Sequence, residues 1–237
     1  MLSLTAAASA AAQIPAAPGV ETILARMAES RVENRARFRP YVVTRDYTLF
    51  GKERHKSTSE VTAKLSFVPP NSKQFHILRS SGSTLGERIV RQMLEGETEI
   101  AEDYGSSDIS LDNYDVRFAG EETLNGQRCF VLDIFPKRKR KNLIRGNVWV
   151  DVGSYLLRRL EGQPAKSPSW WLKNVRVAFT YSQVEGMWLQ TGSEYTTNVR
   201  IFGRYAITSR DVGYDFTSLA GVALPGSMTL PRAGELE

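Results

Sequence analysis

The stretch from Pro136 to Trp171, PKRKRKNLIRGNVWVDVGSYLLRRLEGQPAKSPSWW, is the most informative about the fold. Two runs within it, Asn147–Asp151 and Tyr155–Leu160, have the character of paired strands, and in the first Val148 and Val150 face away from Trp149 and Asp151. Such alternation is typical of β-strands. Gly153 lies between the runs and favours a turn there, because glycine enters φ > 0 without a steric penalty. We therefore predict a β-hairpin with Gly153 in its turn.

The rest of the C-terminal half continues this pattern. Alternating apolar residues predict strands around Tyr114–Phe118, Phe130–Ile134, Val175–Tyr181, Met187–Leu189, Tyr195–Ile201 and Tyr205–Tyr214. Asn125-Gly126 is a strong hairpin signal, because a type I′ turn needs φ > 0 at both central residues. Glu185-Gly186 marks another turn. About seven antiparallel strands in succession are typical of a curved sheet or an open barrel.

The N-terminal half adds two helices and three strands. Apolar residues at Val20, Ile23, Leu24, Met27 and Ala28 have helical spacing, which predicts an amphipathic helix over Val20–Phe38. A second helix is expected over Thr84–Gly96, opened by a capping box of Thr84 and Glu87 and followed by an acidic segment. The predicted strands are Tyr41–Phe50, Val61–Phe67 and Lys73–Arg79.

These elements predict an α+β fold: an unclosed, strongly curved antiparallel β-barrel with both helices covering its concave face. The uncharged, alanine-rich residues 1–18 resemble a secretory signal without its basic region, and a disordered leader is the alternative. We expect residues 19–218 to form a single domain and residues 219–237 a loose tail. No cysteine follows the leader and no later run has the length to span a bilayer, so we expect a soluble periplasmic protein without a lipid anchor.

Composition narrows the function classes. The 237 residues carry a formal net charge of +5, which fits an anionic partner such as a lipid headgroup. Cys129 is the single cysteine, which excludes an intramolecular disulfide and a Cys-rich zinc site. His55 and His76 are the only histidines, and the sequence contains no nucleophile elbow, Walker loop or dinucleotide fingerprint. We therefore expect no catalytic residues, no metal, no cofactor and no enzymatic activity.

Several blocks resemble a known family. Asn113-Tyr114-Asp115, Gly120-Glu121-Glu122, Gly146–Asp151, Pro168-Ser169-Trp170 and Gly186–Leu189 are similar to segments of bacterial outer-membrane lipoprotein-sorting-like proteins of the LolA/LolB superfamily. The resemblance covers about residues 20–216. It implies an unclosed barrel with a helical lid that holds lipoprotein acyl chains. That family has an arginine in an Arg-Pro-Asn-type latch after its second strand, where this chain has Val68-Pro69-Pro70-Asn71.

The resemblance and the alternation together predict a ligand site without polar chemistry, in which a lipid or a lipoprotein acyl chain lies between sheet and helices. Each buried methylene of such a chain gains roughly 0.8 kcal/mol. The candidate residues are Ile23, Leu24, Met27, Phe67, Phe75, Ile77, Ile89, Met93, Val116, Phe118, Phe130, Leu132, Val177 and Phe179. The alternative is that helices and sheet pack against each other as a plain core. A further alternative is an envelope sensor or protein-interaction domain without lipid cargo.

Two surface features suggest contact with a membrane or a protein. The basic run includes Lys137, Arg138, Lys139 and Arg140, and suits an anionic membrane surface or an envelope protein. An ordinary solvated hairpin end that prevents edge-to-edge pairing is the simpler reading. Trp170 and Trp171 suit a membrane interface or a protein partner, and the alternative is that they cap the barrel end. We expect no nucleic-acid binding and a monomer.

Overall fold

The computed structural model describes residues 18–51, 56–103, 105–168, 172–199 and 203–217. The predicted leader up to residue 17 and the predicted tail from residue 218 lie outside this part of the chain. The helices are α1 (Val20–Ala36) and α2 (Thr84–Glu102). The strands are β1 (Tyr41–Phe50), β2 (Ser57–Val68), β3 (Ser72–Gly82), β4 (Tyr114–Leu124), β5 (Gln127–Pro136), β6 (Ile144–Asp151), β7 (Leu157–Pro164), β8 (Leu172–Val184), β9 (Met187–Val199) and β10 (Gly203–Asp215).

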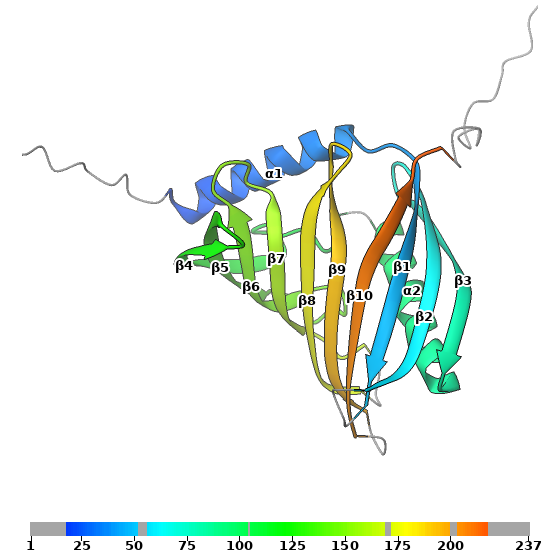
Figure 1. The fold of residues 1–237 in the computed structure, drawn as a ribbon. Coiled ribbons are helices and arrows are strands. Elements are labelled where there is room, and N and C mark those ends of the chain that lie inside the picture. The colour runs from blue at the N-terminus through cyan, green and yellow to red at the C-terminus, as the bar shows by residue number, and fades with distance from the viewer. Residues whose placement is uncertain (1–17, 52–55, 104, 169–171, 200–202, 218–237) are drawn as a thin grey trace, which may run out of the picture.

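The ten described strands form one antiparallel sheet in the order β3-β2-β1-β10-β9-β8-β7-β6-β5-β4. The pairing of β1 with β10 joins the first three strands to the long meander of the C-terminal half. The edge strands β3 and β4 do not pair with each other, so the sheet curves without closing, as Figure 1 shows. The predicted unclosed barrel with two helices is confirmed.

Both helices pack on the concave side of the sheet. In Figure 1, α1 crosses one end of the strands and α2 lies behind β1–β3. Ile23, Leu24 and Met27 of α1 are buried against the β4–β8 half of the sheet, and Ile89, Val90 and Leu94 of α2 against the other half. The amide of Asn34 also fixes the end of α1, since it donates to the carbonyl of Trp188 (2.9 Å) and accepts from the Trp188 N–H (2.7 Å).

Two of the predicted hairpin turns can be compared with the structure. Asn125 and Gly126 both have positive φ (51° and 79°), as the predicted turn requires. Gly153 lies in the turn between β6 and β7 as predicted, but the residue with positive φ in this hairpin is Tyr155 (55°), so the expected positive φ of Gly153 was wrong. The carboxylate of Asp151 shapes this turn instead, because it accepts the backbone N–H groups of Gly153 (3.1 Å) and Ser154 (2.8 Å).

Helix α2 begins at Thr84 as predicted, but its N-cap and its C-terminal end differ from the prediction. Ser83 is the N-cap, because its hydroxyl accepts the Leu85 N–H at 3.2 Å, and Thr84 is the first helical residue. The predicted capping box was therefore wrong, and Glu87 instead accepts a hydrogen bond from Arg91 (2.9 Å). The helix also passes Gly96 and ends at Glu102. This extra turn and a half carries Glu97 to the concave face.

Candidate functional site

The concave face is the candidate functional site, because the predicted ligand-binding residues lie there. They fall into two groups of packed side chains. The α2 cluster contains Phe67, Phe75, Ile77, Ile89 and Met93. The α1 cluster contains Ile23, Leu24, Met27, Val116, Phe130, Leu132, Val177 and Phe179. The remaining candidate, Phe118, is 38% exposed on the edge strand β4, and its ring contacts that of Phe130 in the α1 cluster, with centroids 6.2 Å apart.

Aromatic side chains of β8 and β9 lie where the two clusters meet. Tyr195 is half-buried and packs against both clusters. Its ring contacts the edge of Phe179, with centroids 5.8 Å apart. The Ser193 and Ser209 hydroxyls share a buried hydrogen bond of 2.7 Å nearby. The middle of the concave face is thus lined by half-buried aromatic rings, whereas Ile23 of α1 and Leu132 of β5 are fully buried.

A charged cluster lies under α2, and sequence reasoning missed it. We call it the Arg45 cluster; it consists of Arg45, Lys73, Glu97 and Asp211. The Arg45 guanidinium donates to Asp211 and, at 2.9 Å, to Glu97. Lys73 donates to the other oxygen of Glu97 at 2.6 Å. The side chains of Arg45 and Asp211 are only 6% and 1% exposed, so this is a buried ionic network.

The network sets the protonation of its members. Desolvation acts to raise the pKa of Glu97, but the charges of Lys73 and Arg45 and their hydrogen bonds outweigh it and lower the pKa to about 2. Desolvation likewise acts to lower the pKa of Arg45, while Glu97 and Asp211 raise it well above the usual range. Glu97 and Arg45 are therefore both charged at neutral pH. Burial, followed by the charge of Glu97, raises the pKa of Tyr195.

One local signal pointed to this cluster. Along β1 the inward positions are Tyr41, Val43, Arg45, Tyr47 and Leu49, all buried. An arginine at an inward position of an alternating strand requires a buried partner, because an unpaired buried charge is costly. The sequence did not predict which residues pair with Arg45, since Asp211 is 166 residues away and Glu97 comes from a different element.

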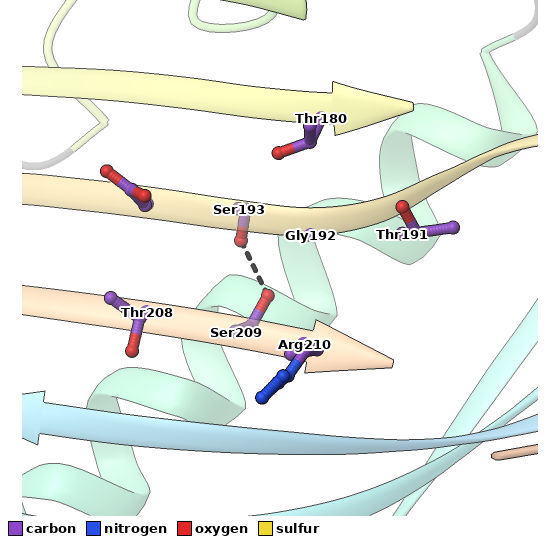
Figure 2. Close-up of a pocket in the computed structure, with 8 residues that line it drawn as sticks. Thr180, Thr191, Gly192, Ser193, Thr208, Ser209 and Arg210 are labelled. Carbon is purple, nitrogen blue, oxygen red and sulfur yellow. Dashed lines mark hydrogen bonds between the residues drawn. The ribbon is translucent and has the colours of Figure 1, made fainter. Parts of the chain in front are cut away.

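Two shallow hollows lie elsewhere, on the outer face of the sheet. One of about 280 Å³ is lined by Thr180, Thr191, Gly192, Ser193, Glu194, Thr208, Ser209 and Arg210, and Figure 2 shows α2 on the far side of these strands. A second of about 150 Å³ is lined by Asn174, Arg176, Thr196, Thr197 and Asn198. Both are lined mainly by polar side chains, and neither includes a predicted ligand-binding residue.

The predicted surface contacts are only partly described. Lys137, Arg138, Lys139 and Arg140 are exposed at the end of β5. Two of them also have structural contacts: Lys137 donates to the Leu111 carbonyl (2.6 Å) and Arg138 to the Asn113 side chain. Trp170 and Trp171 lie outside the described residues, and so does His55. His76 is exposed on β3, and Cys129 is buried.

The described residues contain no group of three or more His, Cys, Asp or Glu side chains placed to hold a metal ion. Among the described helices, none combines the length and the apolar character needed to cross a membrane.

Comparison with known proteins finds similarity only among solved structures, because no family model and no curated protein matches the chain. A domain from Vibrio parahaemolyticus described as outer membrane lipoprotein-sorting has 15% identity and a TM-score of 0.47, over 86% of this chain and 95% of that one. A DUF1329 family protein from Desulfovibrio piger has 12% identity and a TM-score of 0.43, over 86% and 95%. A LolA superfamily protein from Nitrosomonas europaea has 10% identity and a TM-score of 0.41, over 84% and 94%.

Proposed function

We propose that this chain is a non-catalytic binding protein that holds a lipid or the acyl chain of a lipoprotein on its concave face. The observation that carries the proposal is the division of that face into two apolar clusters, each covered by its own helix. A helix that covers one apolar cluster can leave it without unfolding the sheet, because the strands are paired to one another throughout. The exposed cluster then offers an apolar surface to an acyl chain.

The energies are of a size that permits exchange of a helix for a ligand. Ile89, Val90 and Leu94 of α2 are buried, and burial of each such side chain contributes roughly 1.5–3 kcal/mol. A chain of about sixteen carbons gains about 12 kcal/mol at roughly 0.8 kcal/mol per methylene. The gain from the ligand therefore exceeds the cost of exposing these three side chains of α2. In the state described here the helices fill that space.

We further propose export to the periplasm and a contact surface for an anionic membrane or an envelope protein. The alanine-rich leader supports export. The exposed basic run from Lys137 to Arg140 supports the surface contact, since each cation near an anionic membrane adds about 1 kcal/mol. The same run favours the second candidate function, a protein-interaction or sensor domain, if the concave face takes no ligand.

Two neighbouring residues of β8 provide a matched test. Phe179 belongs to the α1 cluster, while Thr180 lines the hollow on the outer face. We expect Phe179→Asn to weaken the binding of a fluorescent acyl probe about tenfold or more, because the half-buried ring is lost from the apolar surface. Thr180→Asn should bind like the unmodified chain. Equal binding by both folded variants would place the acyl chain away from this face.

A further inference from the structure

The Arg45 cluster joins the one helix that covers it to three strands. Arg45 comes from β1, Lys73 from β3, Asp211 from β10 and Glu97 from α2. It lies among apolar side chains of the α2 cluster, in which Tyr47 and Leu65 are 2% and 1% exposed. Lys73 is opposite Phe67 in the register of β2 and β3, next to the predicted ligand-binding residues. The charges therefore stand at the border of the proposed acyl site.

The two carboxylates of this cluster are held differently. Asp211 is fixed within the sheet, because β1 and β10 pair Arg45 directly with it and Tyr214 donates to it at 2.5 Å. Glu97 is the member contributed by a helix, and its side chain is 28% exposed against 1% for Asp211. Its carboxylate accepts hydrogen bonds from the two cations, Arg45 and Lys73. Movement of α2 away from the sheet removes Glu97 and leaves Asp211.

Charge balance then decides which ligand can take the place of α2. With the helix in position, two cations face two carboxylates. Without Glu97, Arg45 and Lys73 face Asp211 alone, and one positive charge is left uncompensated at a largely buried site. An unpaired buried charge is strongly unfavourable. A neutral ligand leaves that cost in place, whereas a ligand with one negative charge beside its apolar chain removes it.

We propose that Glu97 occupies the position of a ligand's anionic head, and that the ligand is an acyl compound whose single negative charge replaces Glu97 on Arg45 and Lys73. This inference rests on the proposed function and names the ligand class. A fatty-acid carboxylate and a phosphodiester headgroup share the required chemistry. Both place oxygen acceptors next to an acyl chain, and both suit an arginine and a lysine as donors.

Matched ligand pairs test the inference by competition against a neutral fluorescent acyl probe. The pairs are palmitate with hexadecanol, and palmitoyl lysophosphatidylglycerol with palmitoyl lysophosphatidylcholine. For each pair the measured quantity is the ratio of the affinity of the anionic to that of the net-neutral ligand. Because a loosened helix changes both affinities alike, the ratio isolates the charge. Preference confined to one pair identifies the carboxylate or the phosphodiester as the head.

Three variants supply the contrast. In Glu97→Gln the anion that a ligand must displace is gone, and we expect the affinities of both members of a pair to rise about tenfold, the size of one charge-assisted hydrogen bond, with their ratio unchanged. In Lys73→Gln a cation is lost, and the ratio should fall towards one. Glu99→Gln makes the same change as Glu97→Gln at an exposed position of α2 and should leave both affinities unchanged. Circular dichroism and thermal unfolding verify that each variant is folded.

The outcomes separate this inference from the proposed function. Binding of both members of each pair, with the same ratio in all four proteins, overturns the headgroup inference and leaves acyl binding intact. Failure of every form to bind any of the four ligands overturns both. Higher affinity for both members of a pair in Glu97→Gln, together with a ratio that falls in Lys73→Gln alone, is the result that the Arg45 cluster predicts.

Discussion

Glu97 shows how a single residue links the helix to the sheet. Its carboxylate takes hydrogen bonds from Arg45 and Lys73, and these hold its pKa at about 2 against the desolvation that acts to raise it. A carboxylate with a lowered pKa stabilises the folded state fully above its usual pKa near 4.5. That contribution is lost as the pH falls through the folded value of about 2.

The lowered pKa of Glu97 predicts that the folded state loses stability in acid. Between about pH 4.5 and pH 2 we expect Glu97 to account for a loss of about 3 kcal/mol in the free energy of unfolding. Glu97→Gln should lack that part of the pH dependence, and Glu99→Gln should keep it. Urea unfolding at a series of pH values measures the difference. Parallel pH curves for the unmodified chain and Glu97→Gln would contradict the assignment.

At this scale the sequence predicted apolar positions better than polar ones. Period-two alternation grouped Phe67, Phe75 and Val177 with the apolar residues of the covered face, because successive side chains of a strand point to opposite faces of the sheet. The Arg45 cluster follows no such rule, since its members come from four elements and meet only in the folded chain. Phe118 was assigned to the covered face of the sheet, but it lies on an edge strand. The alternation of residues along a strand does not show whether that strand is at the edge of the sheet.

Helix α2 depends on a close approach to the sheet near its beginning. A Cβ atom added to Gly86 would lie 2.4 Å from the Cβ of Ser59, which is closer than real contacts allow. Ser59 is buried and accepts the N–H of Ser83, so it is fixed in place. Glycine at position 86 therefore lets the first turn of α2 rest on β2. The later glycine, Gly96, has no atom within 4 Å of such a Cβ.

The two glycines give a matched prediction for the element. Gly86→Ala should destabilise the protein and loosen α2, because the helix has to move away from Ser59. Gly96→Ala should stabilise it by up to about 1 kcal/mol, since alanine is the better helix former. Chemical denaturation gives both free energies of unfolding, and hydrogen exchange of α2 amides reports the loosening. Stabilisation by Gly86→Ala would show that α2 does not sit this close to β2.

The ends of elements were predicted well where a local rule applies. Asn125-Gly126 predicted its turn because that geometry requires φ > 0 at two adjacent residues, which few dipeptides accept. The turn after β6 was predicted at the right place but with the wrong conformation, because Asp151 organises it through its carboxylate and Tyr155 has the positive φ. The end of α2 escaped as well: Gly96 weakens a helix locally, whereas the contacts of Glu97 with the sheet support its continuation.

For the whole molecule, hairpin succession predicted the meander, and the need to cover an apolar concave face predicted where the helices lie. The pairing of β1 with β10 brings Arg45 opposite Asp211 and so creates the ionic network under α2. Such a long-range pairing leaves no local trace in the sequence. The division of the interior into an α1 cluster and an α2 cluster likewise depends on how two helices share one curved sheet.

We propose that the concave face binds an acyl chain in exchange for a helix. Native mass spectrometry of the chain incubated with palmitate and with palmitoyl lysophosphatidylglycerol tests this exchange, with lipid extraction and analysis of whatever the protein carries when purified. We expect complexes with one ligand per chain, and their loss in Phe179→Asn but not in Thr180→Asn. A folded protein that carries no lipid and forms no complex with either compound would contradict it.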